Sequence, residues 1–337
     1  MHHRGRSGGA GHPGPPHRLR AGAPGVDARD RGAGGGDRLS GRSFLARSER
    51  FEAVGSTNDV VRSWLAEGTP EVGLAVAGQQ TAGRGRAGRG WTAPPGVALL
   101  LSAGFRPTYL EPPLVWRLAA IVALAMADAA EDAAGLPDGA IRLKWPNDLV
   151  VEAAGPGALL GAEIEPRAAR ERLEAPVELR KLGGVLGETD GLGTPDPRAV
   201  VGIGINADWP EEAFPPELAG GMTSLRVASG GRPIDRTALL EGFLARLEPR
   251  LEALRSGRFP VGDWVDRQAT TGRIVRLAEP GGGPSRDARA LGVDPTSGGL
   301  VVADPAAAGG ERIVLAGDVD RLRIVGDAVT APARSGV

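Results

Sequence analysis

Lysine and asparagine are scarce in this 337-residue chain, and both occur inside short patterned segments. The two lysines are Lys144 in KWPND and Lys181 in KLGGVLGE, against 38 arginines. The three asparagines are Asn58 in STND, Asn147 in WPND and Asn206 in GIGIN. An ammonium is a compact, strongly hydrated charge that a planar guanidinium does not replace. These scarce ammoniums and amides therefore mark the expected functional site.

The KWPND segment carries the clearest chemistry. It places Lys144, Asn147 and Asp148 around Pro146, which rigidifies the turn. An ammonium, an amide and a carboxylate so close together can bind the phosphate or sugar of a nucleotide and a magnesium ion. The alternative is that Asn147 and Asp148 are only turn residues after a strand.

A glycine- and arginine-rich loop at 79–91 is the second candidate. GRGRAG at 83–88 matches the consensus sequence of the dinucleotide-binding fingerprint. That fingerprint requires a helix to begin directly after the glycines, whereas further glycines and prolines follow here, so we reject the match. The loop still offers backbone N–H groups and three arginines, Arg84, Arg86 and Arg89, which suit phosphate and carboxylate oxygens. The alternative is a solvated basic loop.

GIGIN, taken alone, favours a glycine-containing core strand that ends in a turn at Asn206.

Alternating strand and helix patterns must position these segments. The apolar periodicity predicts helices at 57–65, 114–134 and 236–254, and strands at 72–77, 97–103, 141–145, 149–151, 181–186 and 200–205. In the strand at 141–145, Lys144 falls on the face opposite the core. Residues 154–178 have no clear place in a sheet and are predicted to be an insertion. Short strands at 272–277, 300–303, 312–315 and 322–325 predict a small terminal barrel.

Composition excludes several function classes. The chain has no cysteine, and all four histidines lie in the first 17 residues. A disulfide framework, a thiolate nucleophile and a zinc–cysteine site are thereby excluded, and the absence of cysteine fits a reducing cytoplasm.

The first fifty residues carry ten arginines and four acids without periodicity, which predicts a disordered tail. An RNA-binding tail or an untranslated upstream segment are the alternatives. The apolar run at 118–126 is too short to cross a membrane, so we expect a core helix.

Taken in order, STND, QQTAGRGRAGRGW, KWPND, KLGGVLGE and VVGIGIN resemble the catalytic core of biotin protein ligases, over residues 51 to about 265. The resemblance implies an α+β fold. Its core is a mixed sheet flanked by helices, of the class II synthetase-like biotin/lipoate ligase type, followed by a small C-terminal SH3-like β-barrel. The expected domains are a tail at 1–50, a catalytic domain at 51–268 and the barrel at 269–330.

The resemblance also implies roles for individual residues. Those expected to hold biotin are Ser56, Thr57, Asn58, Gln80, Arg84, Gly85, Arg86 and Lys181. Those expected to hold ATP are Arg86, Arg89, Trp91, Lys144, Asn147 and Asn206. Lys181, Arg86 and Asp148 are the expected catalytic residues, and Asp148 is the expected contact to Mg²⁺, which is held mainly through the ATP phosphates.

The implied reaction joins biotin and ATP into biotinyl-5′-AMP and then transfers biotin to a lysine of a biotin carboxyl carrier domain of an acyl-CoA carboxylase. No side-chain nucleophile is needed, because cations and N–H donors screen the two anions. A lipoate protein ligase with the same chemistry and an RNA-binding protein are the alternatives. No helical period precedes residue 51, so we expect no specific DNA binding, and no membrane partner. The sequence leaves a homodimer as one of the possible oligomeric states.

Overall fold

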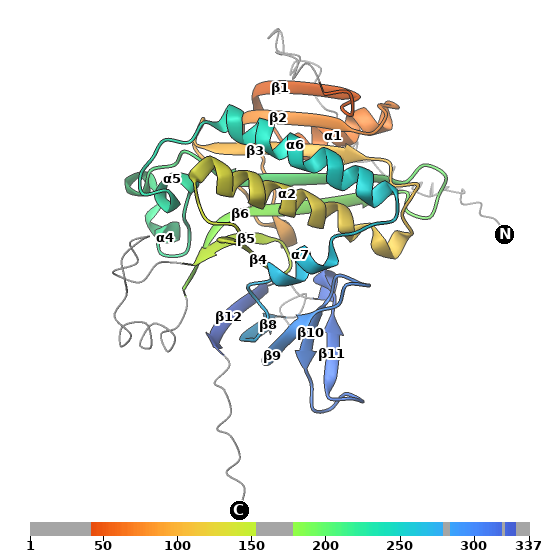
Figure 1. Ribbon diagram of the computed structural model, residues 1–337, viewed down its shortest axis with the longest axis vertical. Helices are drawn as coiled ribbons and strands as arrows, with labels where there is room; N and C mark the ends of the chain where they lie inside the picture. Colours follow the sequence, from red (N-terminus) through yellow and green to blue (C-terminus); the bar gives the residue numbers. More distant parts are fainter. Residues whose placement is uncertain (1–41, 153–177, 279–283, 319–320, 328–337) are drawn as a thin grey trace, which may run out of the picture. The chain divides into compact units, whose positions relative to one another are not determined.

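The computed structural model describes residues 42–152, 178–278, 284–318 and 321–327 (Figure 1). Its strands are β1 (Arg47–Val54), β2 (Gly73–Gln80), β3 (Ala98–Phe105), β4 (Ile141–Lys144), β5 (Asp148–Glu152), β6 (Leu179–Asp190), β7 (Arg198–Asn206), β8 (Arg273–Ala278), β9 (Ser285–Val293), β10 (Leu300–Ala303), β11 (Glu311–Val314) and β12 (Arg321–Asp327). Its α-helices are α1 (Thr57–Ala66), α2 (Trp116–Ala134), α4 (Pro216–Ala219), α5 (Leu225–Ala228), α6 (Arg236–Arg255) and α7 (Val261–Asp266).

A seven-stranded mixed sheet forms the larger part. Its order is β1-β2-β3-β7-β6-β5-β4, in which only the β1–β2 pair is parallel. Helices α2 and α6 run side by side over one face (Figure 1). A second, five-stranded antiparallel sheet has the order β11-β10-β9-β8-β12. The predicted fold class, a mixed sheet with flanking helices and a small C-terminal β domain, is confirmed.

The two-residue period of the strands divides the sheet into a core face and a site face. In β7, Val201, Ile203 and Ile205 belong to the core that α2 and α6 cover. The residues between them, Gly202 and Gly204, therefore lie on the opposite face. GIGIN is thus a core strand on one face and a row of small residues on the other.

Helix α1 lies against that second face. Its residues Val61, Trp64 and Leu65 form a separate apolar cluster with Ala75 of β2 and Val200 of β7. Ser56 precedes the helix with extended backbone, as an N-cap residue does. The predicted helix at 57–65 is confirmed, and its first turn delivers the STND side chains to the site face.

Helix α2 forms much of the core. By length and composition alone it could cross a membrane, but most of it is buried beneath α6 and the sheet. Gly135 ends it in the left-handed conformation, with φ of 57°, where glycine is favoured. The predicted core helix is confirmed.

The hairpin β4–β5 presents KWPND at its turn. Ile141 and Leu143 are buried while Lys144 lies on the other face, as the alternation predicted. Strand β5 pairs with β6, which brings Asp148 opposite Gly184. The turn that carries Asn147 and the strand that carries Lys181 are therefore neighbours.

Three findings differ from the sequence prediction or lie beyond it. Strand β1 begins at Arg47, so the boundary expected at residue 51 falls inside a strand that pairs with β2. Strand β9 was not predicted. The expected insertion at 154–178 and most of the expected tail at 1–50 lie outside the described residues.

Candidate active site

The arginine loop, residues 81–92, leaves β2 and turns back on itself. Its base is closed by hydrogen bonds from Gly85 N to Arg89 O at 2.7 Å and from Trp91 N to Gly83 O at 2.9 Å. The only helical residues are the single 3₁₀ turn Arg86–Gly88, so no helix opens here. GRGRAG is therefore no dinucleotide-binding loop, as predicted. The loop is a folded hairpin that holds its arginines over the site face.

Trp91 fastens the end of this loop to the sheet. A Cβ atom built on Gly204 would lie 2.7 Å from the Trp91 ring, and one on Gly184 would lie 3.6 Å from it. The ring therefore rests directly on backbone that only glycine leaves uncovered. The Nζ atom of Lys181 lies 5.5 Å from the ring centroid, within cation–π range. Trp91 Nε1 is buried without a hydrogen-bond partner in the described structure.

A cavity of about 440 Å³ lies beneath the loop, a volume ordinary for a small-molecule site. Apart from Lys144 and Asp148, all the residues expected to hold biotin, hold ATP or act in catalysis line this cavity. They are Ser56, Thr57, Asn58, Gln80, Arg84, Gly85, Arg86, Arg89, Trp91, Asn147, Lys181 and Asn206. Segments up to 150 residues apart in the chain therefore meet at one place.

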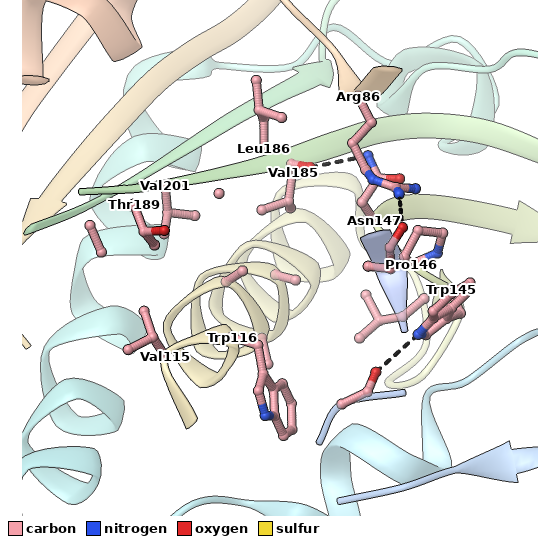
Figure 2. Close-up of a pocket in the computed structure, with 18 of the residues that line it drawn as sticks. Arg86, Val115, Trp116, Trp145, Pro146, Asn147, Val185, Leu186, Thr189 and Val201 are labelled. Atoms are coloured by element: carbon pink, nitrogen blue, oxygen red, sulfur yellow. Dashed lines mark hydrogen bonds between the residues drawn. The ribbon is translucent and has the colours of Figure 1, made fainter. Parts of the chain in front are cut away.

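A second cavity, of about 450 Å³, adjoins the first (Figure 2). It lies among α2, the β4–β5 turn, β6 and the loops of the second sheet, and Lys144 and Asp148 line it. Arg86, Asn147, Val185 and Leu186 line both cavities. These shared residues form the boundary between the two spaces.

Lys181 and Asp148 join the two cavities. Lys181 Nζ lies 2.6 Å from Asp148 Oδ1, and both side chains are half-buried. Lys181 lines the first cavity and Asp148 the second. The backbone of Lys181 is fixed by hydrogen bonds from its N to Gly221 O at 2.8 Å and from Thr223 N to its O at 2.9 Å. The ammonium is thus held at a defined position on the first cavity.

Lys144 lies in a strongly basic environment. The pKa of Lys144 is lowered, and burial is the largest cause. The carboxylate of Asp148 opposes this shift. The nearby positive charges of Lys181, Arg89 and Arg323 add to it. Arg86, Arg89, Lys144 and Arg323 also surround a small pocket of about 180 Å³ beside Asp148. Such a cluster of cations fits a polyphosphate, whose negative charge would raise the pKa of Lys144 again.

The two asparagines expected to bind ATP also hold the backbone in place. Asn147 Nδ2 donates to Val185 O at 3.1 Å, and Val185 N donates to Asn147 O at 2.8 Å. Asn206 Nδ2 donates to Thr223 O at 2.9 Å, and the residue is 4% exposed. Both residues therefore line the first cavity from fixed positions.

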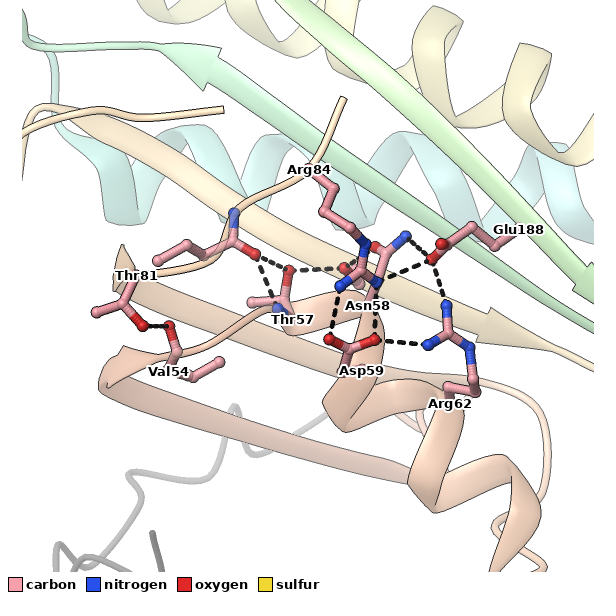
Figure 3. Close-up of polar contacts among 10 residues, drawn as sticks. Val54, Thr57, Asn58, Asp59, Arg62, Thr81, Arg84 and Glu188 are labelled. Atoms are coloured by element: carbon pink, nitrogen blue, oxygen red, sulfur yellow. Dashed lines mark hydrogen bonds and ion pairs between the residues drawn. The ribbon is translucent and has the colours of Figure 1, made fainter. Parts of the chain in front are cut away.

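A polar cluster surrounds the start of α1 (Figure 3). Gln80 Oε1 accepts from Thr57 N at 2.8 Å and from Thr57 Oγ1 at 3.0 Å. Asn58 is 4% exposed, and both ends of its amide bind protein groups, Ser102 and Glu188. Arg84 forms a two-pronged ion pair with Asp59, with both N–O distances at 2.7 Å. These hydrogen bonds lower the pKa of Asp59 and raise that of Arg84.

The sequence prediction missed four of these residues. Ser102 is a polar residue inside the apolar strand ALLLSAGF, which is a detectable signal. Asp59 and Glu188 stand inside segments already singled out, STND and KLGGVLGE, but received no role. Arg323 lies in the second sheet, and nothing in its local sequence marks it.

The carboxylates present do not fit a resident metal site. Within the described ranges, no group of three or more acidic, cysteine or histidine side chains could hold a metal ion. Asp148, the expected contact to Mg²⁺, is already paired with Lys181.

Three comparisons with known proteins show which family this chain resembles. The model of the biotin/lipoate A/B protein ligase family matches residues 51–206. A biotin–acetyl-CoA-carboxylase ligase of Mycobacterium tuberculosis is 30% identical over 274 residues, which cover 80% of this chain and 87% of that protein. A ligase of the same name from Paracoccus denitrificans is 29% identical, with 76% of this chain and 92% of that protein covered.

Among solved structures, the biotin protein ligase of Aquifex aeolicus in complex with biotin and ATP has a TM-score of 0.60 at 24% identity. That alignment covers 84% of this chain and 100% of the other, and it shows the shared fold. The relative that is 30% identical, together with the family model, identifies the chain as a member of the biotin protein ligase group of the biotin/lipoate A/B protein ligase family.

Proposed function

We propose that this chain activates biotin with MgATP to form biotinyl-5′-AMP and diphosphate, and then transfers the biotinyl group to a lysine amine, releasing AMP. The observation that carries the proposal is the first cavity. It unites the polar groups at the start of α1 with the cations of the arginine loop and β6, around a space of about 440 Å³. The relatives named as biotin–acetyl-CoA-carboxylase ligases support the choice of biotin and of the acceptor.

The first half-reaction joins two anions. The biotin carboxylate must attack the α-phosphate of ATP, and the repulsion between them falls when fixed cations and N–H donors surround both. Four cations, Arg84, Arg86, Arg89 and Lys181, line the first cavity, and we assign this role to Lys181 and Arg86. Thr57 and Gln80 supply the polar groups for the ureido ring of biotin. Lys144 and Arg89 are placed to hold the outer phosphates.

The second half-reaction needs an amine to reach the acyl carbon. We assign the approach of this amine to the second cavity, which shares Arg86 and Asn147 with the first. Asp148 lines that side, so its carboxylate is placed to hold and orient the incoming lysine while Lys181 stays on the phosphate side. The attacking nitrogen forms the amide, the acyl–phosphate bond breaks and AMP leaves.

We propose that the acceptor is the biotin carboxyl carrier domain of an acyl-CoA carboxylase and that the reaction takes place in the cytoplasm, which the cysteine-free sequence fits. The test is incubation of the purified protein with MgATP, biotin and a carrier domain that has one acceptor lysine. A mass increase of one biotinyl group, absent when that lysine is replaced by arginine, is the expected result. Modification by lipoate instead of biotin would contradict the proposal.

A further inference from the structure

The second cavity offers more space than the acceptor amine needs. Its volume of about 450 Å³ equals that of the first cavity and lies in the range that encloses a small-molecule ligand. Side chains of α2, the β4–β5 turn and β6 surround it, among them Trp116, Trp145 and Val185 (Figure 2). A lysine is a four-carbon stem with one amine, which leaves most of this space unfilled.

Small residues keep the space between helix α2 and strand β6 open. Ala119 and Ala123 of α2 and Gly187 of β6 line the cavity. Among the described residues, a Cβ atom built on Gly187 would meet a single atom within 4 Å, Ala119 Cβ at 4.0 Å. A Cβ atom on Gly202 or Gly204 of β7 would instead collide with a side chain, at 2.1 Å and 2.7 Å. Gly187 therefore borders open space, whereas the two glycines of β7 make room for side chains.

Gln268 adds one polar group to the apolar walls of this cavity. It lines the cavity and is 4% exposed. Its Nε2 atom donates to Trp264 O at 3.1 Å, and a backbone carbonyl can only accept, so this contact decides which end of the amide carries the oxygen. In the part of the chain that the structure describes, Gln268 Oε1 is buried without a hydrogen-bond partner. The cavity therefore contains an unused hydrogen-bond acceptor.

The neighbouring strand β4 fixes the position of this acceptor. Leu143 N donates to Arg267 O at 2.8 Å, and Ala269 N donates to Leu143 O at 2.8 Å, so the backbone on both sides of Gln268 pairs with β4. The side-chain amide cannot turn without losing its contact to Trp264. A buried acceptor without a partner destabilises the protein, and a molecule that donates a hydrogen bond to it removes that cost.

The charged groups that line the second cavity already have roles or partners. Its two cations, Arg86 and Lys144, are assigned above to the anions of the first half-reaction. Of its two carboxylates, Asp148 lies 2.6 Å from the ammonium of Lys181, and Glu188 accepts from a side-chain amide at 2.6 Å. A neutral molecule therefore suits the remaining space better than an ion.

We infer that the second cavity is a binding site for a small neutral molecule that has an apolar body and one N–H or O–H donor. The apolar body packs between α2 and β6, against Ala119 and Val201, and the donor pairs with Gln268 Oε1. A molecule in this position blocks the path assigned to the acceptor amine, so it slows transfer and leaves adenylation unchanged. Binding itself is independent of the proposed function, and only this effect on transfer rests on it.

Indole is the probe for the donor, because it is a small apolar molecule with one N–H group, and 1-methylindole, which lacks that group, is its matched control. Titration calorimetry of the purified protein should give an affinity for indole about tenfold higher than for 1-methylindole, the scale of one hydrogen bond to a buried group that is otherwise unpaired. Gln268→Met keeps the length of the side chain and removes the acceptor, so it should bind both compounds alike. Equal affinities in the wild-type protein, a preference that persists in Gln268→Met, or no binding of indole would overturn the inference.

A cavity-filling variant tests the location. Ala119→Leu places a larger side chain in the space that Gly187 leaves open, and it should abolish the binding of indole. Ala133→Leu, at an exposed position on the same helix, is the matched control and should bind indole as the wild-type protein does. Undiminished binding to Ala119→Leu would place indole elsewhere and overturn the inference.

Measuring the two half-reactions separately distinguishes this inference from the proposed function. Indole should slow transfer of biotin to the carrier domain over the concentration range in which it binds, and biotin-dependent exchange of pyrophosphate should stay unchanged. Inhibition of the exchange reaction would place indole in the first cavity and overturn the inference. Protein that binds indole with the expected preferences but exchanges no pyrophosphate would overturn the proposed function alone.

Discussion

Replacing Gly204 by alanine should disable the site while leaving the fold intact. The new Cβ atom would lie 2.7 Å from the ring of Trp91, where ordinary contact begins at 3.4 Å. The ring, and with it the end of the arginine loop, must therefore move by about 0.7 Å or more. Overpacking of this kind costs about 1 to 3 kcal/mol. If that cost falls on the closed loop, kcat/KM for biotin should fall about 5- to 150-fold.

The assay is biotin-dependent exchange of pyrophosphate into ATP, with thermal unfolding of the same samples. Gly187→Ala, on the neighbouring strand β6, is the matched control, because the nearest atom to its new Cβ would be Ala119 Cβ, 4.0 Å away on α2. We expect the control to retain activity within about twofold and Gly204→Ala to lower Tm by no more than about 4 °C. Equal activity of the two variants would refute the argument that Trp91 fixes the loop on bare backbone.

Three further predictions follow from the same geometry. Lys181→Ala should lower kcat for adenylation by about 10²- to 10³-fold, as loss of one electrostatic contact to a developing charge does. The loss of thermal stability should be much smaller. A loss of stability without a loss of rate would show that Lys181 has no part in the chemistry. Arg86→Gly should let biotinyl-AMP escape, and mass spectrometry should find biotin on bystander lysines; labelling confined to the carrier would contradict this. Because burial lowers the pKa of Lys144, its charge is lost as pH rises through that lowered value, so KM for ATP should increase in the alkaline range. Lys144→Arg should delay the increase to higher pH, since a guanidinium stays charged; identical profiles would exclude Lys144 from phosphate binding.

The strongly periodic elements could be predicted from the sequence. The helices at 57–65, 114–134 and 236–254 correspond to α1, α2 and α6, because each buries one apolar stripe against the sheet or, for α2, nearly its whole surface. Lys144 could be placed on the face opposite the core because β4 alternates cleanly. Scarcity of residue types pointed to Asn58, Asn147, Lys181 and Asn206, which line the first cavity, because lysine and asparagine occur only in the patterned segments.

The elements that escaped prediction have no such pattern. Strand β1 is an edge strand without a single buried residue, and β9 carries three charged residues, Arg286, Asp287 and Arg289, in its first five positions. Pairing with neighbours, and not burial, makes them strands, and pairing is not visible in a local window. Glu188 and Asn58 are 130 residues apart, so their contact depends on the sheet order. The place of Arg323 beside Lys144 likewise depends on the position of the second sheet, which the local sequence does not give.

The most direct test of the central claim is pyrophosphate exchange into ATP by the purified protein with magnesium and, in separate reactions, biotin, lipoate, octanoate or no acid. The account predicts exchange that requires biotin, because the ureido site and the cations over the carboxylate belong to one cavity. Exchange with lipoate alone, or no exchange with any acid, would contradict it.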